Sequence, residues 1–309
     1  MAEKTKLLFL AANPMDEGRL RLDQEFRRVS KALEGSTHSS QVEVHHWPEA
    51  HLKDLVEHQT KFAGRSFQQI YHVDFYNQHN ELVAEGDSWV FRTDRDEARE
   101  RGTKYTEARG RVERYTEEQL AEFTRLYQTE EIRGATPRYW EDVKEGEALP
   151  RMMKGPMTVT GFICYAQGWG GLYIRANKLA NKMQQAHPGL GIRNRFNVPD
   201  CPERVHWDEE FALEVGAPGA YDYGPERCSW LTHHVTNWMG DDGFLRKSKC
   251  QIRRHNPDGD AIYIDGTVTR KFVEGDKHLV EISQKAETHR GETSAFGTSI
   301  VELPSRTTK

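Results

Sequence analysis

Residues 224 to 303 constrain the fold more than any other part of the chain, because they combine one helical pattern with a following run of strands. The helix is expected to begin at Gly224-Pro225, since proline suits the first helical turn, and to end at the Gly240-Asp241-Asp242-Gly243 turn. Apolar residues at a spacing of three and four form the buried stripe of an amphipathic helix. In this helix they are Leu231, Val235 and Trp238, with Trp230 beside them.

Four strand-like segments follow the helix, each alternating apolar and polar residues and each closed by a turn signal. They are Phe244 to His255, Ala261 to Phe272, His278 to Thr288 and Thr293 to Leu303. Short turns between alternating strands predict an antiparallel meander with one dry face. Because that face needs a cover, we expect an α+β fold in which the sheet wraps on the helix just upstream.

The length and charge of the chain bound its class. At 309 residues it is long enough for about two domains. Its 43 Lys and Arg against 48 Asp and Glu give a net charge of -5, which excludes a bulk attraction to nucleic acid or to an anionic membrane. No apolar run approaches the roughly 20 residues of a membrane span. The four cysteines form no C-x-x-C pair, which indicates reduced thiols and a cytoplasmic protein.

Residues 1 to 60 read as strand, helix and strand. The apolar run Leu7 to Ala12 is followed by a helical pattern over Leu20 to Leu33 and by the alternating segment "QVEVHHW". The phrase "LLFLAANP…RLRLDQEFRRVSKAL" resembles the first β-α-β unit of the flavodoxin-like TIR and CHAT signalling domains. The resemblance covers only about 50 residues, too few for a complete domain of that kind.

An internal repeat links two distant strands. "ELVAEGDSWV" (Glu81 to Val90) matches "ETSAFGTSIV" (Glu292 to Val301) without gaps, and both share an Ala-x-Gly-x-Ser-x-Val frame. The repeat favours duplication over chance, so residues 61 to 92 are expected to be the terminal strands of an amino-terminal unit. Residues 93 to 136 are highly charged and read as a linker with one amphipathic helix, before a domain of residues 137 to 309.

The segments "RYWEDVKEGEALP…KGPMTVT" and "RVHWDEEFALEVGAPGAYDYG", followed by the meander, resemble the MaoC-like acyl dehydratase family, in particular its long bacterial members with two units in one chain. The likeness runs from about Phe62 to Arg306. It implies the hotdog fold, with one complete carboxy-terminal unit and a partial or atypical amino-terminal unit. It also implies addition or removal of water at an enoyl thioester, usually of coenzyme A, in fatty acid metabolism. No cofactor is implied, and a homodimer is an assembly that such sheets commonly form.

Active members of that family carry a Gly-Asp-x-Asn-Pro-x-His-x-Asp motif, in which the first Asp and the His activate a water. His206-Trp207-Asp208 matches the His-x-Asp end of the motif. Two alignments remain for the first carboxylate. One places it at Gly168-Trp169, where no acid is present, and the other at Asp200, one residue further from the histidine than in the family. Residues 170 to 199 read as an insertion that covers the site.

Each of these polar candidates has a structural alternative. His206 is either the catalytic acid or base, with Asp200 as its partner carboxylate, or a packed histidine before a helix. Asp200 is otherwise a residue of a proline-flanked turn. Asp208 is either a substrate contact or the cap of a helix over residues 209 to 215.

The start of the central helix supplies the other substrate-binding candidates. Gly224 offers either a backbone N–H to a developing oxyanion or an ordinary helix entry. Tyr223, just before it, and Trp169, after the helix that starts at Thr158, are expected to contact the substrate. The basic strand Arg246 to Arg254 is either a phosphate site for coenzyme A or a solvated face. No set of His, Cys and acidic residues has metal-ligand spacing, so no metal is expected.

We therefore expect a MaoC-like hydratase or dehydratase that acts on an acyl thioester, with a coenzyme A ester as its substrate. The alternative is a hotdog protein that binds an acyl thioester, or serves as a structural subunit, without turnover.

Overall fold

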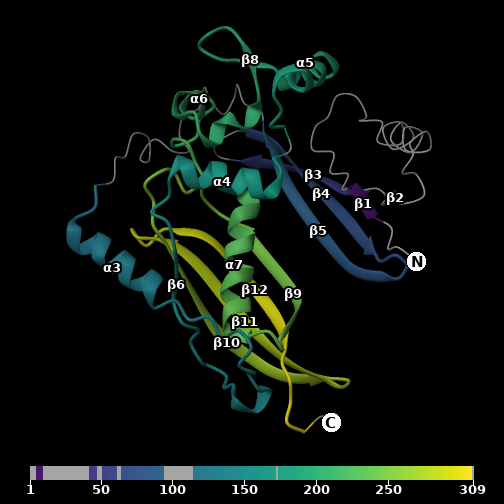
Figure 1. Ribbon diagram of the computed structural model, residues 1–309, viewed down its shortest axis with the longest axis vertical. Helices are drawn as coiled ribbons and strands as arrows, with labels where there is room; N and C mark the ends of the chain where they lie inside the picture. Colours follow the sequence, from purple (N-terminus) through teal and green to yellow (C-terminus); the bar gives the residue numbers. More distant parts are fainter. Residues whose placement is uncertain are drawn as a thin grey trace. The chain divides into compact units, whose positions relative to one another are not determined.

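Residues 5–9, 42–46, 51–60, 64–93, 114–171 and 173–307 are described in the computed structural model of the chain (Figure 1). Contacts divide the chain into two compact units, Met1–Thr103 and Lys104–Lys309, which we call the first and the second unit. The helix expected over Leu20 to Leu33 lies outside the described residues, as does the charged segment just before residue 114.

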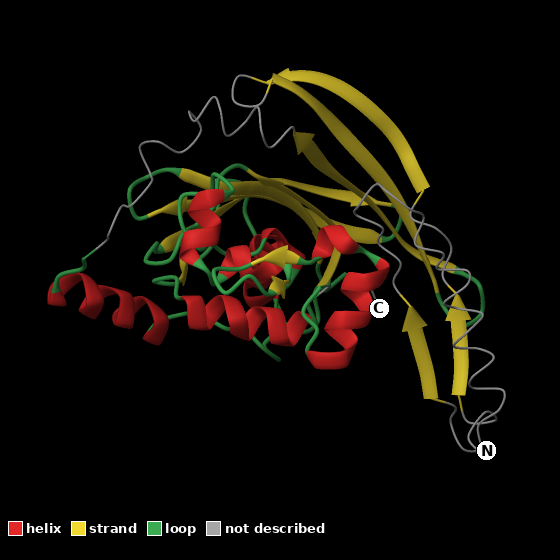
Figure 2. Cartoon of the chain, turned by 90° about the horizontal axis from the view of Figure 1, so that it is seen from above, coloured by secondary structure: helices red, strands yellow, loops and turns green. Residues whose placement is uncertain are grey.

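The second unit is built on a five-stranded antiparallel sheet with the order β6-β10-β11-β12-β9. Its strands are β6 (Met152–Lys154), β9 (Phe244–Ile252), β10 (Ile262–Glu274), β11 (Lys277–Thr288) and β12 (Thr293–Glu302). The sheet curls around α7 (Gly224–Met239), which lies on its concave side (Figures 1 and 2). The expected helix and the four expected strands are therefore confirmed, with ends shifted by a few residues.

The apolar stripe of α7 is buried against this sheet. Its buried hydrophobic members include Trp230, Leu231, Val235 and Trp238. Leu231 packs in one cluster with Ile262 and Ile264, whereas Val235 packs in a second cluster with Val280 and Val301. Burying one such aliphatic side chain contributes about 1.5–3 kcal/mol, so the contact between α7 and the sheet forms the core of the unit.

Two glycines of the sheet allow α7 to pack closely against its strands. A Cβ at Gly266 would lie 3.0 Å from His234 Cε1, and a Cβ at Gly297 would lie 3.2 Å from Leu231 Cδ1. A Cβ at Gly297 would also collide with the carbonyl oxygen of Lys249 in the neighbouring strand. The glycine of the repeated Ala-x-Gly-x-Ser frame thus has a packing role in the second unit.

A buried polar bridge also joins the sheet to α7. Gln284 Nε2 donates to the carbonyl oxygen of Leu231 (2.8 Å) and lies 3.2 Å from His234 Nδ1. Ser299 Oγ donates to Gln284 Oε1 at 3.0 Å. These bonds satisfy polar groups whose burial without partners would be unfavourable.

Shorter elements precede α7 in the second unit. They are α3 (Glu117–Gln128), η2 (Trp140–Asp142), α4 (Val159–Trp169), α5 (Asn177–Ala186), η3 (Pro188–Leu190), β7 (Ile192–Arg193), β8 (Pro199–Asp200), η4 (Pro202–His206) and α6 (Glu209–Glu214). Thr116 caps α3 by accepting from the Gln119 N–H, and Thr158 caps α4 by accepting from the Gly161 N–H. In the described part of the chain, no helix combines the length and the apolar character that crossing a membrane requires.

The first unit contains two small sheets among its described residues. β1 (Thr5–Phe9) and β2 (Val42–His46) pair in parallel. β3 (His51–Thr60), β4 (Gly64–Tyr76) and β5 (Leu82–Thr93) form an antiparallel meander.

This meander has the register of β10, β11 and β12. Ala84 pairs with Phe75 in the first unit, and its repeat equivalent Ala295 pairs with Ala286 in the second unit. β4 and β5 therefore correspond to β11 and β12 with the same difference in residue number. The ladder irregularity after Phe75 recurs after Ala286. The irregularity in β3 after Leu52 likewise recurs in β10 after Val268. A duplication of the strand unit predicts such a common register.

Candidate active site

Tyr223, the residue before α7, is the centre of an aromatic cluster. The side chain is only 3% exposed. The His206 ring stacks on it, with centroids 3.7 Å apart and an interplanar angle of 25°. Tyr165 and Trp169 of α4 place their rings 5.5 and 5.7 Å from it. Three separate stretches of the chain therefore meet at this one side chain.

His206, the last residue of η4, is held by a backbone carbonyl. Its Nδ1 lies 2.7 Å from the carbonyl oxygen of Tyr221. Because that oxygen can only accept, Nδ1 carries the hydrogen and Nε2 keeps its lone pair. Burial lowers the pKa of His206 to about 4, so the ring is neutral at pH 7. Among the described residues Nε2 has no hydrogen-bond partner, which leaves it able to accept a proton.

Glu203 supplies a buried carboxylate to the same cluster. Residues three apart share a face of a 3₁₀-helix, so Glu203 and His206 lie on one side of η4. Glu203 Oε2 accepts from the Tyr223 hydroxyl (3.2 Å) and Oε1 accepts from the Tyr173 N–H (2.6 Å). Glu203 thus fixes the ring on which His206 stacks. The sequence analysis does not identify Glu203 as a site residue, although a carboxylate three residues before His206 in a short helical turn indicates that the two share a face.

A buried ion pair fixes the loop that leads into α7. The Asp222 carboxylate is fully buried, with Oδ2 2.8 Å from Arg227 Nε. Asp222 also accepts from the N–H and the side-chain amide of Asn256, at 3.0 and 2.7 Å. Removing one partner of such a pair costs about 3–5 kcal/mol, because a charge stays buried without compensation. Since Asp222 lies between Tyr221 and Tyr223, this network positions both.

The first turn of α7 adds a backbone donor and a carboxyl group. The Gly224 N–H has no acceptor among the described residues, as expected for the first N–H of a helix. Glu226 Oε2 lies 3.4 Å from the Tyr223 N–H, which donates to it. Burial, followed by repulsion from Asp222, raises the pKa of Glu226 to about 7. This end of α7 therefore offers a hydrogen-bond donor to an oxyanion and a carboxyl group that is partly protonated at neutral pH.

An apolar pocket of about 300 Å³ adjoins the aromatic cluster. It is lined by Ile163, Ala166, Gln167, Gly170, Gly171, Ile174 and Trp207. Trp207 directly follows His206, and Ala166 directly follows Tyr165. The lining is suited to an aliphatic chain.

Asp200 and Asp208 line a different, polar pocket of about 680 Å³. Asp200 accepts from the Cys201 N–H (2.7 Å) and from Asn194 Nδ2 (3.2 Å), and it lies 3.9 Å from Arg204. Asp208 caps α6 by accepting from the Phe211 N–H at 3.0 Å. Within the described part of the chain, no hydrogen bond joins Asp200 to His206.

Trp169, another residue expected to contact a substrate, is the last residue of α4. It is 41% exposed and stacks on Tyr165 with centroids 6.1 Å apart. Of the six residues expected from the sequence, the structure thus gathers His206, Tyr223, Gly224 and Trp169 at one place, and sets Asp200 and Asp208 in the other pocket.

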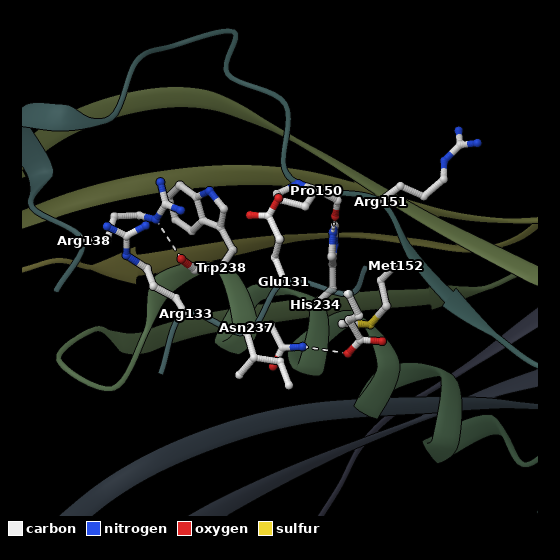
Figure 3. Close-up of a pocket in the computed structure, with 11 residues that line it drawn as sticks. Glu131, Arg133, Arg138, Pro150, Arg151, Met152, His234, Asn237 and Trp238 are labelled. Atoms are coloured by element: carbon white, nitrogen blue, oxygen red, sulfur yellow. Dashed lines mark hydrogen bonds between the residues drawn. The ribbon is translucent and has the colours of Figure 1, made fainter. Parts of the chain in front are cut away.

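A further pocket, of about 190 Å³, lies against the carboxy-terminal half of α7 (Figure 3). Two of its polar side chains, Arg138 and His234, hydrogen-bond to backbone carbonyl oxygens. Arg138 lies over the Trp238 ring and donates to the Trp238 carbonyl oxygen (2.7 Å), while His234 Nε2 donates to the Pro150 carbonyl oxygen (2.8 Å). Burial also lowers the pKa of His234. These contacts hold Arg138 and Pro150 against α7, and we assign them no catalytic role.

The sequence matches no protein-family model and no curated protein. Solved structures do match: one, a MaoC-like dehydratase, aligns with a TM-score of 0.50 and 15% identity over 82% of this chain and 68% of that chain. The chain has the hotdog fold of the MaoC-like dehydratases. A putative MaoC domain protein dehydratase from Chloroflexus aurantiacus is similar at a TM-score of 0.45, with 14% identity over 82% of this chain and 69% of that one. An (R)-hydratase from A. caviae involved in PHA biosynthesis is similar at a TM-score of 0.39, with 15% identity, 53% of this chain and 99% of that chain.

The hotdog fold expected from the sequence is therefore confirmed. Its central helix is α7 and its wrapping sheet contains β9 to β12. The aromatic cluster lies at the amino end of the central hotdog helix, where free backbone N–H groups gather.

Proposed function

We propose that this protein is a hydratase, or in reverse a dehydratase, that adds water across the double bond of an enoyl thioester, with a coenzyme A ester as the substrate. The observation that carries the proposal is the contact between His206 Nδ1 and the Tyr221 carbonyl oxygen, because it leaves Nε2 as a neutral base beside the amino end of α7. The acyl chain is assigned to the apolar pocket that Trp207 lines.

In the proposed reaction His206 Nε2 takes one proton from water, and the oxygen of that water forms a bond to the β-carbon. The π electrons move to the thioester carbonyl, whose oxygen accepts from the Gly224 N–H as negative charge develops. The α-carbon then takes a proton from Glu226, which lies in the same helical turn as Gly224. The proton on His206 returns to Glu226 through solvent, so the net reaction adds one water.

The assignment of acid and base follows from the two pKa values. An environment that lowers the pKa of His206 to about 4 and raises that of Glu226 to about 7 keeps the imidazole unprotonated, and part of the carboxyl groups protonated, at neutral pH. We assign Glu203 a positioning role, because both of its oxygens hold neighbouring groups of the cluster.

The second candidate function is binding of an acyl thioester without turnover. It is favoured by the dense filling of the cluster, since Tyr223 is almost fully buried between other rings. A protein of this kind would keep the apolar pocket and lack the space for an attacking water.

Incubation of the full chain with short and medium trans-2-enoyl-CoA, followed by the loss of the conjugated thioester absorbance, separates the two functions. The proposal predicts enzyme-dependent loss of this absorbance and formation of the 3-hydroxyacyl thioester. Binding of acyl-CoA in a calorimeter with no hydration would select the binding function instead. Absence of both binding and hydration would contradict both.

A further inference from the structure

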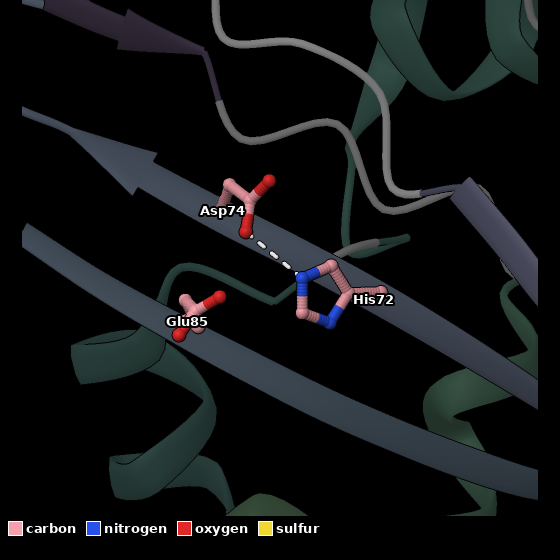
Figure 4. Close-up of side chains that lie close together, drawn as sticks. All are labelled: His72, Asp74 and Glu85. Atoms are coloured by element: carbon pink, nitrogen blue, oxygen red, sulfur yellow. Dashed lines mark hydrogen bonds and ion pairs between the residues drawn. The ribbon is translucent and has the colours of Figure 1, made fainter. Parts of the chain in front are cut away.

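A cluster of one histidine and three carboxylates lies on one face of β4 and β5 in the first unit. Figure 4 shows three of its members, His72, Asp74 and Glu85. His72 and Asp74 are two residues apart on β4, so their side chains point to the same face. Asp87 lies opposite His72 in the ladder, and Glu85 lies opposite Asp74. The ligand atoms of His72, Asp74 and Glu85 all lie within 4.8 Å of one another.

Asp87 gives the His72 ring a defined orientation. Its Oδ1 lies 2.8 Å from His72 Nδ1, and the other ring nitrogen, Nε2, lies 2.9 Å from Asp74 Oδ1. A carboxylate that accepts from Nδ1 orients the ring so that Nε2 can bind a cation in place of its proton, which is the usual arrangement around a metal-bound histidine. Nε2 then faces the Asp74 and Glu85 carboxylates.

The carboxylates of Asp74 and Glu85 face each other across the ladder, and among the described residues Asp74 is paired with His72. Like charges directly opposite each other in an antiparallel pair are destabilising. Glu85 has no hydrogen bond or ion pair to any other described residue, so no arginine or lysine there compensates it. A cation held between Asp74 and Glu85 would remove this repulsion.

The fold itself does not require this cluster. The positions in the second unit that correspond to His72, Asp74, Glu85 and Asp87 carry other, exposed residues. They are, in that order, Ser283, Lys285, Phe296 and Thr298. Two meanders with one register thus differ at the four positions that make the cluster. Spacing along the sequence does not reveal the site, because its groups come from two strands and meet only through the β4–β5 ladder.

We propose that His72 Nε2, Asp74 and Glu85 bind a divalent cation on this face of β4 and β5, with Asp87 holding the His72 ring in place. One nitrogen and two carboxylate oxygens suit Zn²⁺, with bonds of about 2.0–2.2 Å, and they leave a coordination position for water. Binding joins β4 to β5 and stabilises the first unit.

The test is a calorimetric titration of the full chain, stripped with a chelator, with ZnCl₂ at neutral pH. Glu85→Gln is the sharpest variant, because Glu85 is exposed and its replacement leaves both hydrogen bonds of His72 intact. We expect Glu85→Gln and His72→Ala to lose one equivalent of bound zinc. Asp87→Asn should lower the affinity for that zinc ion by about tenfold or more.

His79→Ala is the matched control, since His79 lies in the exposed turn between the same two strands. It should leave the zinc isotherm of the wild-type chain unchanged. The proposal is overturned if Glu85→Gln and His72→Ala bind as much zinc, with the same affinity, as His79→Ala. Circular dichroism of each variant checks that the sheet is retained.

Discussion

His206 and Glu226 lie in environments that move their pKa values in opposite directions. Burial lowers the pKa of His206 to about 4 and raises the pKa of Glu226 to about 7. The Tyr221 carbonyl oxygen fixes the tautomer of His206, and the first turn of α7 carries Glu226 next to the Gly224 N–H. An imidazole that stays neutral and a carboxyl group that keeps part of its protons are the two groups that water addition needs.

Glu226→Gln is expected to lower kcat/KM for enoyl thioester hydration by about 10²–10⁴-fold, because the amide cannot donate a proton to the α-carbon. Asp200→Asn is the comparison, since the Asp200 carboxylate is bound to Asn194 and to the Cys201 N–H in the polar pocket. It should retain the wild-type rate. A steady-state assay of both variants decides, and loss of activity in Asp200→Asn with full activity in Glu226→Gln would reverse the assignment.

At the residue scale, the sequence led to His206 but not to the groups around it. His206 followed from the His-x-Asp match alone. Glu203 and Glu226 could not be assigned from spacing, because their roles depend on the Tyr223 ring, which brings η4 and α7 together. A carboxylate near in sequence, Asp200, was the natural choice, yet its contacts in the structure are with Arg204 and Asn194.

At the scale of elements, the two glycines of the internal repeat differ in their surroundings. Gly297 in β12 faces α7 and the Lys249 carbonyl oxygen, so there is no space for a methyl group. Gly86, its equivalent in β5, has only Phe75 Cε2 near the position of a Cβ, at 3.9 Å. The glycine of the repeated Ala-x-Gly-x-Ser motif is therefore required for packing in the second unit, whereas in the first unit there is space for a methyl group.

Gly297→Ala is expected to destabilise the second unit by about 1–3 kcal/mol through overpacking against α7 and β9. Gly86→Ala, the matched control, should change the free energy of unfolding by less than about 1 kcal/mol. Urea denaturation followed by circular dichroism measures both. Equal effects of the two substitutions would show that the contact with α7 does not set the requirement for glycine.

Elements with strong periodicity were predictable, and elements fixed by tertiary contacts were not. The apolar stripe of α7 and the alternation of β10 to β12 predicted these elements to within a few residues, because one face of each is buried. The sequence predicts residues 170 to 199 only as an insertion that covers the site. The β7–β8 pair at its end and η4 just after it are short and lack periodic apolar residues, and they are held by contacts such as those of Arg204 with the carbonyl oxygens of Ile192 and Arg193.

At the scale of the whole molecule, the two meanders support a duplication. Their common register and their two shared ladder irregularities agree with the repeat found in the sequence. We propose that the first unit descends from a second hotdog and that the two copies have since diverged. The catalytic groups proposed here all belong to the second unit, whereas the cation site belongs to the first.

The hydration of trans-2-enoyl-CoA by the wild-type chain, His206→Ala and the control His79→Ala, measured as kcat/KM against pH, tests the central claim most directly. We predict that His206→Ala lowers kcat/KM by about 10²–10⁴-fold and that His79→Ala matches the wild type. The wild-type rate should rise with pH through about 4, where His206 loses its proton, and fall through about 7, where Glu226 loses its own. Full activity of His206→Ala, with the acidic limb of the profile unchanged, would contradict the account.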